Sequence, residues 1–414
     1  MVQFAFLKFS LIKKIMTQLT SIGSDGLSAF IAIPTETKGP LLIVLQEIFG
    51  INANIRQICE DFAAEGYVAV APDLFWRQGI GIDINPTDPT AMEKAFSLLE
   101  KFDDKEAISD IARVIDFARE NLQCHGPVAA VGYCLGGRLA LRSLFETDVT
   151  ASVSYYGVGL ENLVTKKIPN GKAALLHVAQ NDNYCPEETQ SMIRSAATGN
   201  LKAHFYADCE HAFARKGSLH FNADAARHAY DRTINFLVPL VGPAYDLESL
   251  WEAHLDYEFK TRDVDLTMST MVAQPYVNHI PTMTGGVGYI DLHRFYRDYF
   301  IGSNPDDTAQ LTISRTVGVR QVVDEVIFSF THTQRMEWLL PGVEPTGKKV
   351  RFGLVGVVRF RGNKLCHEHI YWDQASVLAQ IGLLDIKNLP VIGSLAADKI
   401  VDNSIPSNRL IASW

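Results

Sequence analysis

The stretch that decides the fold is VAAVGYCLGGRLALR, residues 128–142. Its first four residues are small and apolar, which predicts a strand buried on both faces. A helix-forming run begins at Arg138. Between strand and helix, Gly132-Tyr133-Cys134-Leu135-Gly136 has the G-x-S-x-G form of a nucleophile elbow, with Cys134 in place of serine. The helix N-terminus favours a thiolate there. The alternative is a buried structural cysteine among chance glycines.

Outward from this stretch, residues 28–240 alternate between strand-like and helix-like runs. Buried strands are predicted at 41–45, 67–71, 128–131 and 173–178. Strands that alternate with helices predict the α/β class, with a mostly parallel sheet and helices on both faces. Two prolines and a glycine in residues 238–243 interrupt the last helix, which we expect to end at Leu237. We therefore place the domain boundary at 239–246.

A cysteine nucleophile needs a base, and the base needs a group that orients it. In an elbow fold they follow in the order nucleophile, acid, histidine, on loops at the carboxyl ends of later strands. Asp182 is the acid candidate because it follows the strand at 173–178. His211 is the base candidate because it follows a strand-like run. Asp208 and His220 compete by residue type but not by position.

Five motifs in this order resemble the dienelactone hydrolase (carboxymethylenebutenolidase) family, a branch of the α/β-hydrolases with a cysteine nucleophile. They are QEIFG at 46–50, PDL at 72–74, VGYCLGG at 131–137, YYGVGL at 155–160 and HAFAR at 211–215. The resemblance covers about residues 28–238. It implies an α/β-hydrolase fold for a domain at 16–240. It also implies hydrolysis of a lactone or activated ester through a thioester acyl-enzyme, without a cofactor.

The resemblance also implies roles for single residues. Cys134, His211 and Asp182 would form a catalytic triad. Glu47 would sit against the thiol and help to create the thiolate when substrate binds. The backbone N–H groups of two further residues would form the oxyanion hole, which is typically worth about 10²–10³ in kcat for each donor. These two residues are Ile48 and Leu135.

The expected substrate site departs from the family pattern. The family's dienelactone enzymes bind the substrate carboxylate with two arginines and a tyrosine. Arg215 matches one arginine, but Met92 and Phe96 stand where the other arginine and the tyrosine are expected. Phe49, in the first motif, is a further expected substrate contact. A missing charge-assisted hydrogen bond is worth about 1.5–3 kcal/mol, so we expect a more apolar or differently charged ester.

Residues 246–385 predict an α+β domain. Helical stretches are expected at 247–271 and 289–300, followed by strands at 322–330, 334–339, 350–361 and 365–373. The opening LWEAH at 250–254 and the closing HEHIYWD at 367–373 resemble the SnoaL-like group of the nuclear-transport-factor-two-like superfamily. That resemblance implies a curved sheet around a cone-shaped pocket, and often a homodimer formed through the sheet.

A polar pocket is predicted in this second domain. His367, His369 and Tyr371 share one face of the last strand, because side chains alternate with a period of two. We expect three further residues to line the pocket with them, namely His332, Arg335 and Asp373. No metal is predicted, because a pair of strand histidines lacks a third ligand at fixed spacing.

Composition bounds the remaining possibilities. The 414 residues are 47% hydrophobic and 21% charged, which excludes a mainly disordered, collagen-like or coiled-coil chain. A net charge of −9 argues against a nucleic-acid partner. Six cysteines without a CxxC pair favour reduced thiols and a cytoplasmic location. No apolar run of about 18 residues is present, so neither a membrane span nor a membrane partner is expected.

The two ends of the chain are expected to lie outside the domains. Residues 1–15 place lysines after apolar residues, which is the wrong order for a signal peptide. We predict a disordered extension there, with translation or the functional fold starting at Met1 or Met16, and a C-terminal tail at 386–414. A small-molecule lactone or ester hydrolase is the leading function. The alternatives are a ligand-binding or assembly protein that uses the second domain, and a bifunctional enzyme.

Overall fold

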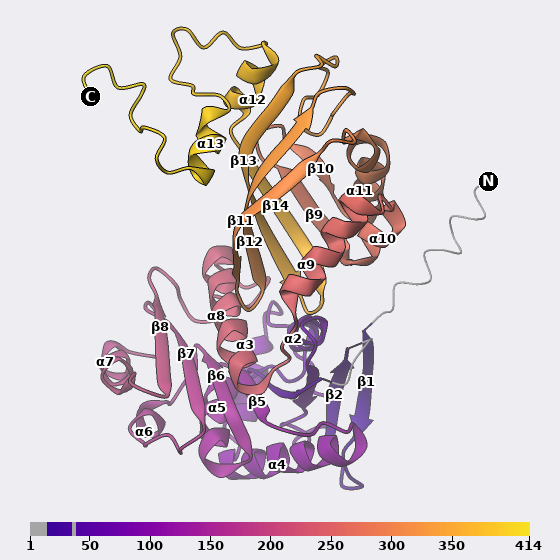
Figure 1. The fold of residues 1–414 in the computed structure, drawn as a ribbon. Helices are drawn as coiled ribbons and strands as arrows, with labels where there is room; N and C mark the ends of the chain where they lie inside the picture. Colours follow the sequence, from indigo (N-terminus) through magenta and orange to yellow (C-terminus); the bar gives the residue numbers. More distant parts are fainter. Residues whose placement is uncertain (1–14, 35–38) are drawn as a thin grey trace, which may run out of the picture. The chain divides into compact units, whose positions relative to one another are not determined.

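The computed structural model describes residues 15–34 and 39–414. The chain divides into two compact units, which separate between Ala244 and Tyr245 (Figure 1). The predicted extension at 1–15 lies outside the described residues, apart from Ile15. Within the described ranges, every helix is too short or too polar to cross a membrane.

The first unit is built on an eight-stranded sheet with the order β1-β2-β4-β3-β5-β6-β7-β8. The strands from β4 to β8 in this order run parallel, whereas β1 and β2 are antiparallel to their neighbours. The bounds are β1 Met16–Ser21, β2 Ser28–Ile33, β3 Leu41–Leu45, β4 Val68–Pro72, β5 Val128–Tyr133, β6 Val149–Tyr155, β7 Ala173–Ala179 and β8 Leu201–Tyr206. Strands β3, β4 and β5 are buried along their whole length, as their apolar runs predict.

Helices cover both faces of this sheet, which confirms the predicted α/β class (Figure 1). Their bounds are α2 Ala53–Ala64, α3 Ala91–Leu99, α4 Asp104–Asn121, α5 Leu135–Glu146, α6 Glu161–Val164, α7 Glu187–Ala196 and α8 Ala223–Val241. The predicted end of the last helix at Leu237 was wrong. Helix α8 continues through Pro239 to Val241, and Gly242, with a φ of 76°, follows it.

Close packing of the main chain forces the bend between β5 and α5. A Cβ atom on Gly132 would lie 1.9 Å from the carbonyl oxygen of Gly136. A Cβ atom on Gly136 would lie 2.2 Å from the carbonyl oxygen of Leu45 in β3. Because both neighbours are backbone atoms, no side-chain movement relieves these contacts. The glycines therefore allow α5 to start directly against the sheet, with Cys134 at the bend.

The second unit contains a six-stranded sheet with the order β10-β9-β14-β13-β12-β11. Neighbouring strands are antiparallel except β9 and β14, which run parallel. The bounds are β9 Met271–His279, β10 Thr284–Val287, β11 Ala309–Val317, β12 Gln321–Thr331, β13 Lys349–Arg361 and β14 Lys364–Trp372. The strand predicted at 334–339 was wrong. Met336, Trp338 and Leu339 are buried in the hydrophobic core without pairing as a strand.

Helical segments pack against this second sheet, and those from α9 to α12 share its hydrophobic core (Figure 1). They are α9 Leu247–Leu255, η2 Asp256–Lys260, α10 Val264–Ser269, α11 Tyr289–Phe295, η3 Tyr296–Phe300, η4 Ile301–Ser303, α12 Gln374–Ile381 and α13 Leu395–Val401. Two of them, η2 and η3, are π-helical turns that directly continue α9 and α11. Helix α13 lies within the region predicted as a tail, and its Asp398 pairs with Arg351 of β13.

Gly136→Ala should destabilise the first unit by about 3 kcal/mol or more, because the new Cβ meets a fixed carbonyl oxygen. Urea-induced unfolding followed by circular dichroism measures this change. Gly79→Ala is the matched control, because its Cβ would meet only the side chain of Ile82, at 3.3 Å. Equal unfolding midpoints for the two variants would contradict the close approach of α5 to β3.

Candidate active site

Cys134 lies at the N-terminus of α5, directly after β5, and is 8% exposed. Its φ of 55° falls in the left-handed region, which non-glycine residues rarely adopt. The Cys134 N–H donates to the carbonyl oxygen of Tyr155 at 3.1 Å, and its carbonyl oxygen accepts from the N–H of Gly137 at 3.0 Å. These two hydrogen bonds hold the backbone of Cys134 in its strained conformation. Strained backbone conformations cluster at active sites.

Asp182 and His211 come from the loops that follow β7 and β8. The Nδ1 atom of His211 lies 2.7 Å from Oδ2 of Asp182. The carboxyl group of Asp182 is fully buried, and its Oδ1 accepts the N–H of Tyr184 at 2.8 Å. A carboxylate beside Nδ1 holds the proton on that nitrogen and orients the ring, which leaves Nε2 available for a second partner.

Cys134 is that second partner of the imidazole. Burial acts to lower the pKa of His211, but hydrogen bonds to Asp182 and to Cys134, together with their charges, raise the pKa to about 10. The rings of Tyr156 and Tyr184 contact the imidazole edge-on, at centroid distances of 5.1 and 4.8 Å. The thiol therefore contacts the imidazole, and the imidazole contacts the carboxylate. Nucleophilic catalysis requires this arrangement.

Glu47 lies in the loop after β3 and is 1% exposed. Its Oε2 is 3.1 Å from Nη1 of Arg215, whereas its Oε1 is buried without a hydrogen-bond partner. The resemblance implies a position against the thiol when substrate binds, which stays a prediction, and the partner that the structure shows for this carboxylate is Arg215. The guanidinium also lies over the ring of Phe49, 5.1 Å from its centroid. Burial acts to lower the pKa of Arg215, and the charges of Glu47 and Cys134 raise it.

The loop at 46–49 lies beside the start of α5, because the N–H of Gly136 donates to the carbonyl oxygen of Gln46 at 3.0 Å. Leu135 is the first residue of α5, so its N–H has no partner within the helix. Among the described residues, the N–H of Ile48 has no backbone acceptor either. The two N–H groups expected to form the oxyanion hole thus lie on neighbouring segments beside Cys134.

Met92 and Phe96 occupy one face of α3, one turn apart. Both are partly exposed, at 42% and 41%. In the part of the chain that the structure describes, no recorded ring or polar contact joins either residue to Cys134 or Arg215. The structure therefore brings Cys134, Asp182 and His211 together, and Glu47 with Arg215, but does not by itself connect α3 with them.

The second unit contains a cavity of about 50 Å³. Its walls are mainly aromatic and aliphatic, as in many ligand pockets. None of the six residues predicted for a polar pocket lines it. Strand β14 contributes Glu368 and Ile370, whereas His367, His369 and Tyr371 belong to the opposite face. This cavity therefore lies on the other face of β14 from the predicted polar pocket, which stays a prediction.

The six predicted pocket residues have other partners. The rings of His367 and His369 stack on each other at 4.7 Å, and Tyr371 is 42% exposed. The remaining three are not gathered at one site. Fully buried His332 lies 3.2 Å from Thr346 Oγ1 through Nδ1, exposed Arg335 pairs with Glu344, and Asp373 caps α12.

Asp182→Asn should lower the pKa of His211 from about 10, because an amide cannot stabilise the imidazolium as a carboxylate does. Histidine resonances followed by NMR during a pH titration measure the shift. The raised pKa stabilises the fold below pH 6.5, and this stabilisation is lost as the pH rises through about 10. The variant should therefore lose less stability over that interval than the wild type.

Glu210→Gln is the matched control for this titration, since Glu210 pairs with the exposed His220 at 3.1 Å. It should leave the His211 resonance unchanged. An unaltered His211 pKa in Asp182→Asn would show that the carboxylate does not control the imidazole.

Comparison with known proteins places this arrangement in a family. The dienelactone hydrolase family profile matches residues 27–241, which is more than half of the chain and lies within the first unit. A carboxymethylenebutenolidase of Pseudomonas putida is 37% identical over 231 residues, covering 54% of this chain and 98% of that protein. Carboxymethylenebutenolidase 1 of Cupriavidus pinatubonensis is 34% identical, covering 55% of this chain and 97% of that protein.

Among solved structures, the dienelactone hydrolase-like promiscuous phosphotriesterase P91 from metagenomic libraries is 17% identical, with a TM-score of 0.44. The match covers 55% of this chain and 99% of that one. The family profile matches the first unit, and the curated relatives match the same region over nearly their whole length. The chain belongs to the dienelactone hydrolase family, and its first unit is a hydrolase domain with an α/β-hydrolase fold.

Proposed function

We propose that the first unit hydrolyses a lactone or an activated ester, with Cys134 as nucleophile, His211 as base and Asp182 as the group that orients the base. The observation that carries this proposal is the shared imidazole. His211 holds Asp182 at 2.7 Å on Nδ1 and has Cys134 as its second partner. The names of the curated relatives, which are carboxymethylenebutenolidases, support the same class of reaction.

In the proposed reaction, the Cys134 thiolate attacks the carbonyl carbon of the ester and forms a C–S bond. The N–H groups of Ile48 and Leu135 stabilise the oxyanion of the tetrahedral adduct. Collapse breaks the C–O bond, and the leaving alkoxide or enolate takes the proton held by His211. His211 then removes a proton from water, whose oxygen attacks the thioester. The carboxylic acid leaves, and the thiolate with its imidazolium is restored.

The residues around the thiol suggest the substrate class. Arg215 offers one guanidinium, which is already paired with Glu47, and Phe49 offers an aromatic face beside it. Met92 and Phe96 supply no further charge. We therefore propose a mostly apolar lactone or enol ester, with at most one anionic group, in preference to a dicarboxylate-like substrate.

The second unit supports a second candidate function, which is capture of a small ligand. We propose that residues 246–385 form a SnoaL-like domain beside a hydrolase domain at 16–240, with residues 386–414 as a C-terminal extension. The mixed six-stranded sheet, the helices packed on it and the cavity with mainly aromatic and aliphatic walls support this proposal. Ligand binding in that cavity would accompany the hydrolase reaction and does not replace it.

Cys134→Ala should abolish hydrolysis of p-nitrophenyl acetate, and Asp182→Asn should lower kcat by about 10³–10⁴, as in other triads. Stopped assays before and after iodoacetamide treatment measure the dependence on the thiol. Cys366→Ser is the control, because Cys366 lies in the second unit and is the most exposed of the six cysteines, all of which lie in the described residues. Turnover that survives complete alkylation of Cys134 would exclude the proposed nucleophile.

Met92→Arg combined with Phe96→Tyr should raise kcat/KM for a carboxylate-bearing lactone by about 10-fold or more, since each restored charge-assisted bond is worth roughly 1.5–3 kcal/mol. Hydrolysis of the neutral p-nitrophenyl acetate by the same double variant is the control and should stay unchanged. Equal effects on both substrates would mean that α3 does not contact the substrate carboxylate.

A further inference from the structure

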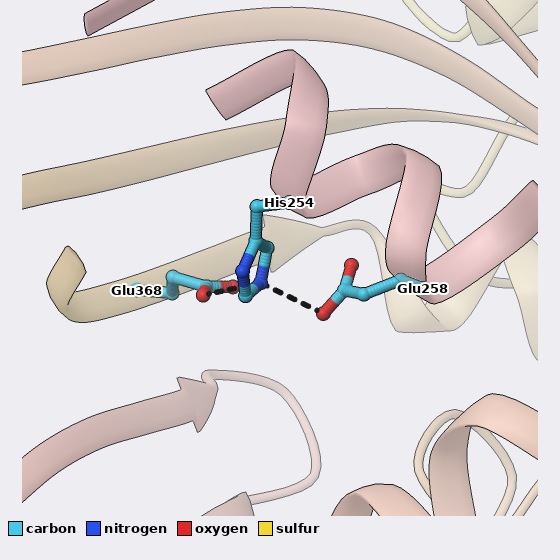
Figure 2. Close-up of side chains that lie close together, drawn as sticks. All are labelled: His254, Glu258 and Glu368. Atoms are coloured by element: carbon cyan, nitrogen blue, oxygen red, sulfur yellow. Dashed lines mark hydrogen bonds and ion pairs between the residues drawn. The ribbon is translucent and has the colours of Figure 1, made fainter. Parts of the chain in front are cut away.

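The second unit holds a buried group of one imidazole and two carboxylates, which we call the His-Glu-Glu cluster (Figure 2). His254 comes from α9, Glu258 from the π-helical turn η2, and Glu368 from β14. Their exposed fractions are 0%, 3% and 3%. Figure 2 shows both carboxylates converging on one edge of the imidazole, and Nε2 of His254 lies 3.1 Å from Oε1 of each.

Thr270 fixes the tautomer of His254. The Thr270 hydroxyl donates its proton to the carbonyl oxygen of Thr267 at 2.6 Å. Its oxygen must therefore accept a proton from Nδ1 of His254, which lies 2.6 Å away. Nδ1 is protonated, and Nε2 is the atom presented to the carboxylates. Metal-binding histidines in proteins are held in the same way, with one ring N–H on an oxygen and the other nitrogen free to coordinate.

A single proton cannot satisfy this arrangement. If Nε2 carries a proton, it donates to Oε1 of Glu258, and Oε1 of Glu368 is left buried without a hydrogen-bond partner. The hydroxyl of Tyr296, which is 1% exposed, lies against both carboxylates but makes no hydrogen bond of good geometry. Buried polar atoms without partners are costly, whereas a dication placed between the two carboxylates and the imidazole would give their acceptor atoms a partner.

The separations suit a metal ion. Zinc binds histidine nitrogen and carboxylate oxygen at about 2.0–2.2 Å with tetrahedral geometry, which places neighbouring ligand atoms about 3.3 Å apart. The two N–O separations here are 3.1 Å, and the three ligand atoms lie within 4.8 Å of one another. Only small side-chain movements are needed to admit an ion among them.

The cluster borders the cavity of the second unit. Glu258, Glu368 and Tyr296 all line it, and the rest of its wall is mainly aromatic and aliphatic. Glu258 and Tyr296 both lie in π-helical turns, which frequently occur at functional sites. Three protein ligands and an adjoining cavity are the usual plan of a metal site that keeps a coordination position open for a small molecule.

We propose that His254, Glu258 and Glu368 bind a divalent transition metal ion, with Zn²⁺ as the preferred ion, and that its open coordination position faces the cavity. The donor set selects the class of ion, because one imidazole nitrogen and two carboxylate oxygens suit Zn²⁺ and its neighbours. Mg²⁺ and Ca²⁺ prefer oxygen ligands alone. This site lies in the second unit, and no group of the proposed hydrolase reaction belongs to it.

The test uses the full-length Cys134→Ser protein, so that the active-site thiol cannot bind metal. After removal of bound metal with a chelator, Zn²⁺ binding is measured by calorimetry and Co²⁺ binding by visible absorption. We expect one ion per chain. Glu368→Gln should weaken binding by about 100-fold or more, since even the loss of an outer-shell partner costs 10–100-fold. His254→Gln is the second ligand variant, and it keeps the test decisive should Glu368→Gln fail to fold.

His369→Gln is the matched control, because it breaks the stacked His367–His369 pair on the same strand without touching the cluster. It should leave both affinity and stoichiometry unchanged. The proposal is overturned if the Cys134→Ser protein binds neither ion at one equivalent. It is also overturned if His369→Gln abolishes binding while the ligand variants retain it. In either case the His-Glu-Glu cluster would be a hydrogen-bonded network that shares a proton and does not bind metal.

Discussion

The positive φ of Cys134 is the constraint on which the first unit depends. The bend at this residue brings α5 so close to β3 and β5 that Gly132 and Gly136 have no room for a Cβ atom. Strain of this kind typically costs about 1–3 kcal/mol and persists only where the surroundings over-determine it. In return, the thiol stands at a helix N-terminus, within reach of His211 and beside the backbone N–H groups of Leu135 in α5 and of the loop at 46–49.

The fold of the first unit could be predicted well because its strands and helices alternate along the chain. The candidate residues follow from the same chain order: the elbow motif marks Cys134, and Asp182 and His211 follow later buried strands, whose carboxyl ends meet at one edge of a parallel sheet. The ion pair of Glu47 with Arg215 could not be predicted in this way, because it depends on side-chain conformations that no spacing in the sequence records.

The second unit was harder to predict for two physical reasons. Residues 334–339 look like a strand because Met336, Trp338 and Leu339 are apolar, yet their apolar character reflects packing into a core. Histidine and tyrosine at 367, 369 and 371 predict a polar pocket on one face of β14, whereas Glu368, on the other face, borders the cavity that the structure shows. A signal for the His-Glu-Glu cluster was present, because His254 and Glu258 are four residues apart on one helical face.

The distribution of tryptophan has a practical consequence. Of the five indoles, Trp251 and Trp338 line the cavity of the second unit, and Trp372 packs against its core, while Trp76 belongs to the first unit and Trp414 is exposed. The Trp251 indole donates to Asp324 at 2.8 Å, so its surroundings are polar on one side and aromatic on the other. Occupation of this cavity should therefore change the intrinsic fluorescence of the intact chain.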